Sequence, residues 1–381
     1  MKIVFLGLTS TFTPGMTYQD NLLCDQIVAD GHQVTYISNP ERFEAGRIVS
    51  TGPEDTVLTN GMRLIRLPYR RLGPDIVTKK FRCFPGVYQI LEEERPEVVF
   101  CNNTQYWSIL DVIRYKKNHP EVKFYADTHS AAYNSGTNWL SLHMLHRIFY
   151  RYLIQKTLPY LEKYLYVGEG ERQFSIQNYG VPESLMEFYP LGGMLLPEET
   201  YQEVRAKRRA ELGLTEGELL LVHTGKLDAL KRTDELLRAF ATVPELKAKL
   251  AVIGSIPEDR KALLTSMMKT DGRVVYLGWK SGEELGEYLC ACDLYCQPGS
   301  VSATLQNAVC RNCAVLSYPH EGYTKDLDYG NFLWTETEAD MVEAFRRLAE
   351  VPALLKPLRE NSRRCASELL DYRKLAARLY Q

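Results

Sequence analysis

The sequence predicts an α/β protein built from two doubly wound domains. The first observation is a strand–helix–strand unit near the start, with apolar strands at 3–7 and 33–38 on either side of a helix at 21–30. The second is a restart of the same alternation over 219–254. Repeated units of this kind indicate parallel sheets with right-handed crossovers. At 381 residues, the chain also has the length of about two ordinary domains.

A segment rich in proline and glycine separates the two series of strands and helices. It covers residues 189–200 and contains two prolines and two glycines, which is typical of a linker between domains. We therefore expect a first domain over 1–195 and a second over 196–365. A C-terminal helix at about 366–381 is expected to pack back on the first domain.

The composition argues against several functional classes. The 46 basic and 48 acidic residues nearly cancel, so nothing indicates nucleic-acid binding. No apolar run approaches the ~18–20 residues that span a bilayer, and the start lacks the pattern of a signal peptide. We therefore expect a cytoplasmic protein. Of the nine cysteines, five cluster over 290–313, but they lack the paired C-x-x-C spacing of a zinc site, which favours buried free thiols.

One candidate for contact with a substrate, a histidine, follows a strand of the first domain. The strand at 122–126 leads directly into Asp127-Thr-His129, and open α/β sheets bind their ligands at the carboxyl ends of strands. A histidine in this position can bond to a substrate hydroxyl. From position alone, the favoured interpretation is that His129 is a loop residue that bonds to the backbone.

The loop at 9–19 also follows the carboxyl end of a strand. It contains Pro14-Gly15 and several hydroxyl groups, so it is a further candidate for ligand contact. It lacks the pattern G-x-G-x-x-G, and dinucleotide binding is therefore not supported.

Two cations follow the first strand of the second domain. Gly225 allows a close approach to the backbone, and Lys226 and Lys231 place ammonium groups near the carboxyl end of the strand at 219–224. Two cations in this position suit a diphosphate. Taken alone, they can also be solvated loop lysines.

A second segment with phosphate-binding features lies at 297–316. Pro298-Gly299 ends a buried strand, and the hydroxyls at 300, 302 and 304 are expected to cap a short helix. The free N–H groups at a helix start attract anions. By itself this is an ordinary strand-to-helix turn, but its occurrence beside the paired lysines favours a phosphate site.

An amphipathic helix is expected over 139–156. Leu142, Leu145, Phe149 and Leu153 share one face, while basic residues lie elsewhere. Such a stripe is usually the core-facing side of a surface helix. The alternative is peripheral contact with an acidic membrane surface.

Beyond these patterns, the second half of the chain resembles the nucleotide-sugar domain of family-4-type retaining GT-B glycosyltransferases. The resemblance rests on Gly225-Lys226-Leu227 with Lys231-Arg232, and on the strand-and-helix segment over 272–293. It is specific over 219–320 and looser before residue 200. There, Pro14-Gly15-Met16 stands where the family usually has paired glycines.

The resemblance implies a GT-B fold, in which two Rossmann-like domains face each other across a cleft. It implies transfer of a sugar from a nucleoside diphosphate sugar to a saccharide or glycolipid acceptor with retention, in polysaccharide or glycan assembly. Catalytic roles are implied for His129, at the transferred sugar, and for Lys226 and Lys231, at the diphosphate. No D-x-D motif lies within the donor loop at 297–316, so neither a metal ion nor another cofactor is expected.

Binding roles follow from the same resemblance. Contacts with the donor are implied for Gly15, Gly225, Lys226, Lys231, Gly278, Trp279, Lys280, Ser302, Ala303, Thr304 and Gln306. Contacts with the acceptor are expected from Thr17, Tyr18 and Asp127.

The sequence departs from the family at two positions of the donor loop. The family usually has two glutamates, one at the sugar and one at the ribose, and these positions align with Pro298 and Gln306. Gln306 can still bond to a ribose diol, whereas the side chain of Pro298 cannot bond at all. Two alternatives therefore stay open: a nucleotide-sugar epimerase of the same fold, and a non-catalytic relative that binds a glycan or a partner enzyme.

Overall fold

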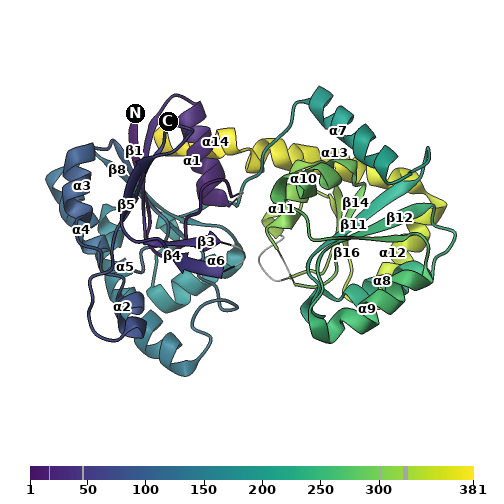
Figure 1. Ribbon diagram of the computed structural model, residues 1–381, viewed down its shortest axis with the longest axis horizontal. Helices are drawn as coiled ribbons and strands as arrows, with labels where there is room; N and C mark the ends of the chain where they lie inside the picture. The colour runs from purple at the N-terminus through teal and green to yellow at the C-terminus, as the bar shows by residue number, and fades with distance from the viewer. Residues whose placement is uncertain (17, 45–46, 301, 321–324) are drawn as a thin grey trace. The chain divides into compact units, whose positions relative to one another are not determined.

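The computed structural model describes residues 1–381 except 17, 45–46, 301 and 321–324. The chain divides into two compact units (Figure 1). The first unit comprises residues 1–190 and 372–381, and the second comprises residues 191–371. The change from one unit to the next thus lies close to the predicted boundary at 195.

The first unit is built on a sheet with the strand order β10-β9-β8-β7-β1-β2-β6-β5. Neighbouring strands are parallel except for β5 and β6. The order reverses between β1 and β7, so the loops after these strands flank the point where open α/β sheets bind ligands. The strands are β1 (Lys2–Gly7), β2 (Gln33–Ser38), β5 (Glu54–Val57), β6 (Arg63–Arg66), β7 (Val98–Cys101), β8 (Lys123–Thr128), β9 (Lys163–Tyr166) and β10 (Met186–Phe188).

Both faces of this sheet are covered. In β1, Val4 and Leu6 belong to one apolar cluster, whereas Ile3 and Phe5 belong to another, as expected when side chains alternate along a strand. The helices are α1 (Gln19–Ala29), α2 (Asp75–Phe81), α3 (Val87–Glu94), α4 (Ile109–Asn118), α5 (Arg151–Thr157), α6 (Glu169–Phe174) and α14 (Tyr372–Tyr380). The C-terminal helix α14 packs beside α1 in this unit (Figure 1).

The second unit is built on a parallel sheet with the order β13-β12-β11-β14-β15-β16. Counted along the chain within the unit, this is the 3-2-1-4-5-6 order of a Rossmann fold. Its switch point lies between β11 and β14. The strands are β11 (Leu219–Lys226), β12 (Ala248–Ser255), β13 (Val274–Gly278), β14 (Leu294–Gln297), β15 (Ala314–Ser317) and β16 (Phe332–Trp334).

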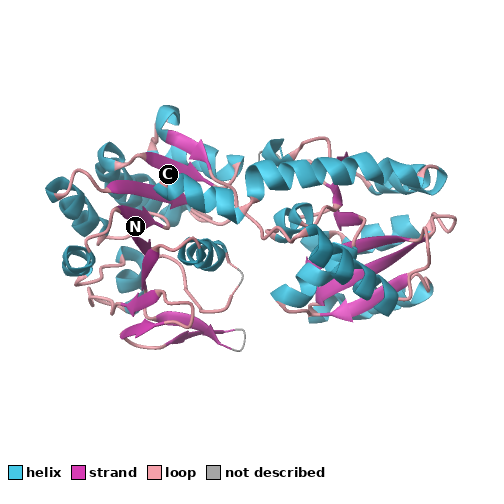
Figure 2. Cartoon of the chain, turned by 90° about the horizontal axis from the view of Figure 1, so that it is seen from above, coloured by secondary structure: helices cyan, strands magenta, loops and turns pink. Residues whose placement is uncertain are grey.

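Helices enclose this second sheet as well (Figure 2). In β11, Leu221 packs in one apolar cluster, while Leu220 and Val222 pack in another, so the strand is buried on both faces. This explains why it appears in the sequence as a continuous apolar run. The helices are α7 (Glu198–Glu211), α8 (Thr233–Ala241), α9 (Glu258–Thr270), α10 (Gly282–Ala291), α11 (Thr304–Cys310), α12 (Glu338–Glu350) and α13 (Leu355–Cys365).

Several details differ from the sequence prediction. A hairpin of β3 (Glu41–Glu44) and β4 (Arg47–Ser50) was not predicted, because half of the residues in these strands are charged and none of them is buried. The expected helix at 139–156 is largely a π-helix, Ser141–Tyr150, that continues into α5. The prediction that hydroxyl groups cap α11 was wrong, since Ala303 is its N-cap residue and has no capping side chain.

The cysteines and the helices relate to two further expectations, which concern a metal site and contact with a membrane. All nine cysteines are free, and eight of them are buried. Within the described ranges, no cluster of three or more His, Cys, Asp or Glu side chains could hold a metal ion. None of the helices in the described part of the chain has the length and apolar character needed to cross a bilayer. Metal independence and peripheral membrane contact stay predictions.

A close backbone contact at the end of β11 gives the first testable result. Gly254 has a φ of +143°, and a Cβ there would lie 1.8 Å from the carbonyl oxygen of Gly225. Gly254→Ala is therefore expected to destabilise the second unit by about 2–4 kcal/mol in urea unfolding. Gly272→Ala, where a Cβ meets nothing within 4 Å, is the matched control. Equal stability of the two variants would contradict this packing.

Candidate active site

The paired lysines at the end of β11 differ in their surroundings. Lys226 is exposed and forms no ion pair with any described residue. Lys231 is only 7% exposed, and its Nζ donates to the carbonyl oxygen of Ser300 over 2.7 Å. Burial lowers the pKa of Lys231 below its ordinary value, and the carboxylate of Asp228 offsets only part of this. An anion beside Lys231 would therefore replace lost hydration.

The structure brings together the two segments that the sequence analysis identified separately. Lys231 reaches Ser300 through its side chain, and the amide of Ser300 donates to the carbonyl of Leu230 over 2.8 Å. Gly299 is required at this crossing, because a Cβ there would lie 2.1 Å from the carbonyl oxygen of Leu230. The turn at 226–232, which we call the lysine turn, is thus joined to the start of the loop after β14 at the switch point.

Arg232 adds a second tie between these segments. Its Nη1 donates to the carbonyl oxygens of Pro298 and Glu336, each over 3.0 Å, and its guanidinium pairs with Glu235. In the sequence, Arg232 stands out only as part of a motif, and no role was predicted for it. Because Arg232 holds the backbone of the loop after β14, we assign it to positioning that loop.

A buried amide lies beneath the loop. Gln297, at the end of β14, accepts hydrogen bonds through Oε1 from Tyr295 over 3.2 Å and from Ser302 over 3.4 Å. Its Nε2 is buried and has no acceptor among the described residues. Gln297 is only 1% exposed, and a buried amide N–H without an acceptor is unusual in proteins. Nothing in the sequence indicated this buried donor.

A neutral histidine fixes the start of α8 beside the lysine turn. His223 Nδ1 lies 2.8 Å from the carbonyl oxygen of Cys296, and Nε2 lies 2.9 Å from Thr233 Oγ1. Burial lowers the pKa of His223 to about 4. The ring is therefore neutral, with the proton on Nδ1 and Nε2 accepting from Thr233.

The predicted donor-loop residues occupy different depths. Ser302 is partly buried and bonds to Gln297, Ala303 precedes α11, and Thr304 is its first residue. Gln306 is only 1% exposed, so its side chain is covered in this structure. Val301 lies outside the described residues.

The predicted nucleotide-base contacts lie at the end of β13. This strand is separated from β11 by β12. Gly278 has a φ of +70°, and Trp279 beyond it is 73% exposed. Lys280 pairs with Glu284 at 3.5 Å. A large exposed ring at a strand end is free to stack on a base.

In the first unit, Asp127 and His129 form a pair at the end of β8. His129 Nε2 lies 3.1 Å from Asp127 Oδ2, and the amide of Asn103 donates to Asp127 Oδ1 over 2.8 Å. Asp127 is 1% exposed, whereas the His129 side chain is 32% exposed. Direct contact of Asp127 with an acceptor was expected, but both of its oxygens are engaged inside the protein.

The electrostatics of this pair favour a charged imidazole. Burial alone lowers the pKa of His129, but the charge and hydrogen bond of Asp127, with smaller effects of Asp20 and Glu171, raise it to about 9. The ring is therefore an imidazolium at neutral pH. Its Nδ1 has no partner among the described residues, so one N–H is available to a ligand.

Several polar residues around the pair were missed by the sequence analysis. Asp20 is buried and accepts from Tyr36 over 2.5 Å and from Asn102 over 2.8 Å. Burial and the charge of Asp127 raise the pKa of Asp20. Asn102 directly follows β7, so the rule that identified Asp127 after β8 could also have identified it. Asp20 gave no comparable signal.

The loop after β1 contributes two of the predicted residues. Gly15 has a φ of +78°, and Tyr18 is exposed, with its ring centroid 6.5 Å from that of Phe43. Thr17 lies outside the described residues. No hydrogen bond among the described residues joins Tyr18 to His129, so a shared role of the two side chains stays a prediction.

The pKa of His129 is measurable by following its ring protons in NMR as the pH is raised. We expect a midpoint near pH 9 in the wild type and a lower one in Asp127→Asn, because the carboxylate charge is lost. The folded pKa exceeds the unfolded one, so the pair's stabilisation is fully present below about pH 6.5 and is lost as the pH rises through about 9. A wild-type midpoint near 6.5 would contradict the pairing.

Comparisons with known proteins agree with this architecture. Residues 204–365 match the family model described as glycosyl transferases group 1. This match covers most of the second unit, which spans residues 191–371. No curated protein sequence matches the chain.

Solved structures extend the likeness over the whole chain. Anabaena HepE in complex with UDP is 14% identical with a TM-score of 0.67, covering 99% of this chain and 98% of that chain. Sucrose-phosphate synthase from Thermosynechococcus elongatus is 14% identical with a TM-score of 0.67, covering 99% and 97%. WaaG, a glycosyltransferase involved in lipopolysaccharide biosynthesis, is 16% identical with a TM-score of 0.64, covering 99% of each chain. The chain therefore has the GT-B fold, with two Rossmann-like domains.

Proposed function

We propose that the protein transfers a sugar from a nucleoside diphosphate sugar to a saccharide or glycolipid acceptor, with retention of the anomeric configuration. The observation that carries this proposal is the pairing of Lys226 and Lys231 at the switch point of a Rossmann-order sheet. Two cations there match the charge of a diphosphate. The match to glycosyl transferases group 1 and the UDP bound by HepE support the same donor class.

In this proposal the second unit stabilises the leaving diphosphate. The exposed ammonium of Lys226 and the partly desolvated one of Lys231 lie where negative charge develops as the glycosidic bond breaks. Fixed charges aimed at developing charge lower the barrier without reorganisation during the reaction. The buried N–H of Gln297 is a further donor on this side. No metal ion is invoked, because the lysines supply the positive charge.

The first unit, in this proposal, acts on the sugar and the acceptor. The imidazolium of His129 donates from Nδ1 to a hydroxyl of the transferred sugar, while Asp127 fixes the ring and its charge. Asp127 is thus a positioning residue. In the loop after β1, Gly15 contributes to the donor side and Tyr18 to the acceptor side.

A non-catalytic relative is the second candidate, favoured by one observation. Pro298 and the covered Gln306 stand where the family has two glutamates, so the contacts to sugar and ribose are reduced. Such a protein would still bind a nucleotide or glycan through the lysines.

Turnover separates these candidates. The full chain is incubated with a panel of nucleoside diphosphate sugars, with and without monosaccharide and glycolipid acceptors, and release of the nucleoside diphosphate is measured. Acceptor-dependent release, with NMR showing an unchanged anomeric configuration in the product, is the expected result. Isomerised donor formed without an acceptor would indicate an epimerase. Donor binding without any turnover would favour the non-catalytic relative.

A further inference from the structure

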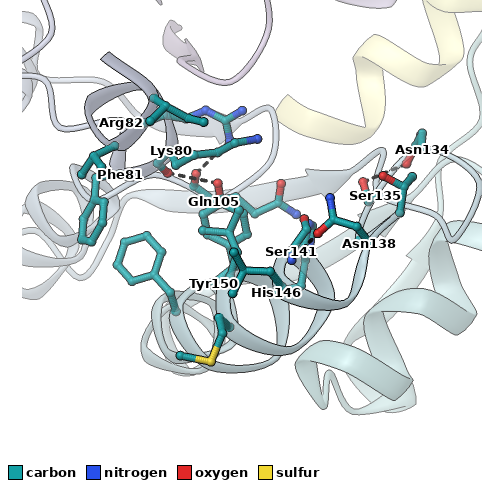
Figure 3. A pocket seen from close by; sticks show the side chains of 18 residues that line it. Lys80, Phe81, Arg82, Gln105, Asn134, Ser135, Asn138, Ser141, His146 and Tyr150 are labelled. Carbon is teal, nitrogen blue, oxygen red and sulfur yellow. Dashed lines mark hydrogen bonds between the residues drawn. The ribbon is translucent and has the colours of Figure 1, made fainter. Parts of the chain in front are cut away.

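A pocket in the first unit lies outside the candidate site described above. Its volume is about 730 Å³, which is in the range of small-molecule sites. It lies between α2 and the π-helix at 141–150. Figure 3 shows Lys80 and Arg82 on one side and Asn134 and Asn138 on the other, with His146 between them.

The polar side of the pocket is positively charged. Lys80 and Arg82 both line it, and no carboxylate does so among the described residues. Neither cation forms an ion pair in the described part of the chain; Arg82 donates only to the carbonyl oxygen of Gln105, over 3.2 Å. Unneutralised cations around a concave surface attract an anion.

His146 adds an uncharged donor to this side. Burial, with the positive charges of Lys80 and Arg82, lowers its pKa to about 4, so the ring is neutral. Its Nδ1 lies 2.7 Å from the hydroxyl of Tyr179, which itself accepts from Gln105 over 2.9 Å. The tyrosine proton is therefore available for Nδ1, and the histidine proton resides on Nε2. This N–H has no partner among the described residues.

The other side of the pocket is apolar and continues onto the surface. Leu140, Met144, Ile148 and Tyr152 recur every four residues and are 50–65% exposed. The first two line the pocket together with the apolar rings of Phe81 and Phe149. These exposed residues form a second stripe, distinct from the core-facing stripe that contains Leu145 and Leu153. An exposed apolar stripe of this kind indicates a binding surface.

The pocket adjoins the candidate site of the same unit. Asn134 lines it and also donates to the carbonyl oxygen of His129 over 2.8 Å. Gln105 lines it as well and donates to Ser130, the residue after His129, over 2.8 Å. A ligand held here would extend toward His129 within the first unit.

We propose that this pocket binds an acceptor of anionic amphiphile type, with a phosphate-like group at Lys80 and Arg82 and an apolar chain along Leu140 and Met144. The acceptor role rests on the proposed function, whereas the binding chemistry rests on the pocket alone. The pairing of unneutralised cations with an exposed apolar stripe selects a ligand that has both parts. A free phosphate lacks the chain, and a neutral lipid lacks the charge.

Calorimetry with three probes tests this proposal. Decyl phosphate, below its micellar concentration, is expected to bind at least ~10-fold more tightly than decyl maltoside or inorganic phosphate. Lys80→Gln and Met144→Asn are each expected to weaken decyl phosphate binding about 10-fold, and both positions are exposed, so folding should persist. Lys207→Gln, which removes an equal charge from the second unit, is the matched control and should bind as the wild type does.

Three results would overturn the proposal: equal binding of the neutral probe, equal binding of inorganic phosphate, or full affinity in both pocket variants. Binding to phosphatidylglycerol vesicles that is unaffected by Lys80→Gln, with no binding of monomeric decyl phosphate, would also overturn it and identify a membrane-contact face. Failure of every nucleotide to bind, with decyl phosphate binding retained, would remove the proposed transferase activity and leave the pocket intact.

Discussion

Lys226→Ala is expected to lower kcat/KM for the donor about 10²- to 10³-fold and to leave the thermal midpoint of unfolding unchanged. Lys226 is exposed and makes no ion pair with a described residue, so its removal should leave the stability of the fold unchanged. The loss would arise from the diphosphate charge that it neutralises. Steady-state kinetics and thermal unfolding of the same preparation check both parts. Lys269→Ala, an exposed lysine of α9, is the control.

Lys231→Ala provides the contrast within the same pair. It should lose comparable activity but also unfold more easily, by about 1–3 kcal/mol, because the carbonyl of Ser300 loses a buried charged donor. If Lys226→Ala retained full kcat/KM, the assignment of the lysine turn to the diphosphate would be wrong. If Lys231→Ala were as stable as the wild type, the tie to the donor loop would be wrong.

His129→Gln is expected to lower kcat about 10²- to 10³-fold while the affinity for the nucleoside diphosphate stays the same. Glutamine keeps a hydrogen-bonding group but loses the charge that Asp127 stabilises in the imidazolium. In the wild type, kcat should fall as the pH rises through about 9, where the ring loses its proton. In Asp127→Asn this fall should occur at lower pH.

The matched control is His119→Gln, which alters a histidine of the same unit that pairs with Glu92. A pH profile that is flat across pH 7–10, or an unchanged kcat in His129→Gln, would show that the imidazolium takes no part in the rate-limiting step. Because the proposed function assigns the nucleoside diphosphate to the second unit, an equal loss of nucleotide affinity in His129→Gln would point to a folding defect instead.

The sheet architecture was predictable because buried parallel strands appear in the sequence as apolar runs. Strands such as β11 and β14 are covered on both faces, and glycine or proline ends them. The hairpin β3–β4 gave no such signal. Half of its described residues, 41–44 and 47–50, are charged and none of them is buried, and the pairing depends on contacts that a local pattern does not encode.

Residues of the candidate site were predictable where a charged or titratable side chain closely follows a strand. This rule located His129 and the lysine turn, and the structure places each of them at the carboxyl end of a parallel sheet. It did not predict that Asp127 would be fully engaged by Asn103 and His129. That contact depends on the neighbouring positions of β7 and β8, which strand order determines.

The buried pair formed by Asp20 and Tyr36 shows the remaining limit of sequence reasoning. Asp20 lies in the first turn of α1, and it is buried because Tyr36 of β2 and Asn102, which directly follows β7, both donate to it. The pocket at Lys80 could not be predicted from the sequence either. Its lining comes from α2, the loop after β8 and the π-helix, segments that are far apart in the sequence.

The central claim is that the paired lysines at the switch point of the second unit bind a nucleoside diphosphate. The most direct measurement is isothermal titration calorimetry of the full chain with a panel of nucleoside diphosphates, repeated with Lys226→Ala. We predict that at least one of them binds with a stoichiometry of one, and that the substitution weakens its binding by at least ~10-fold, about 1.4 kcal/mol. The absence of binding by any nucleoside diphosphate, or equal affinity in Lys226→Ala, would contradict the claim.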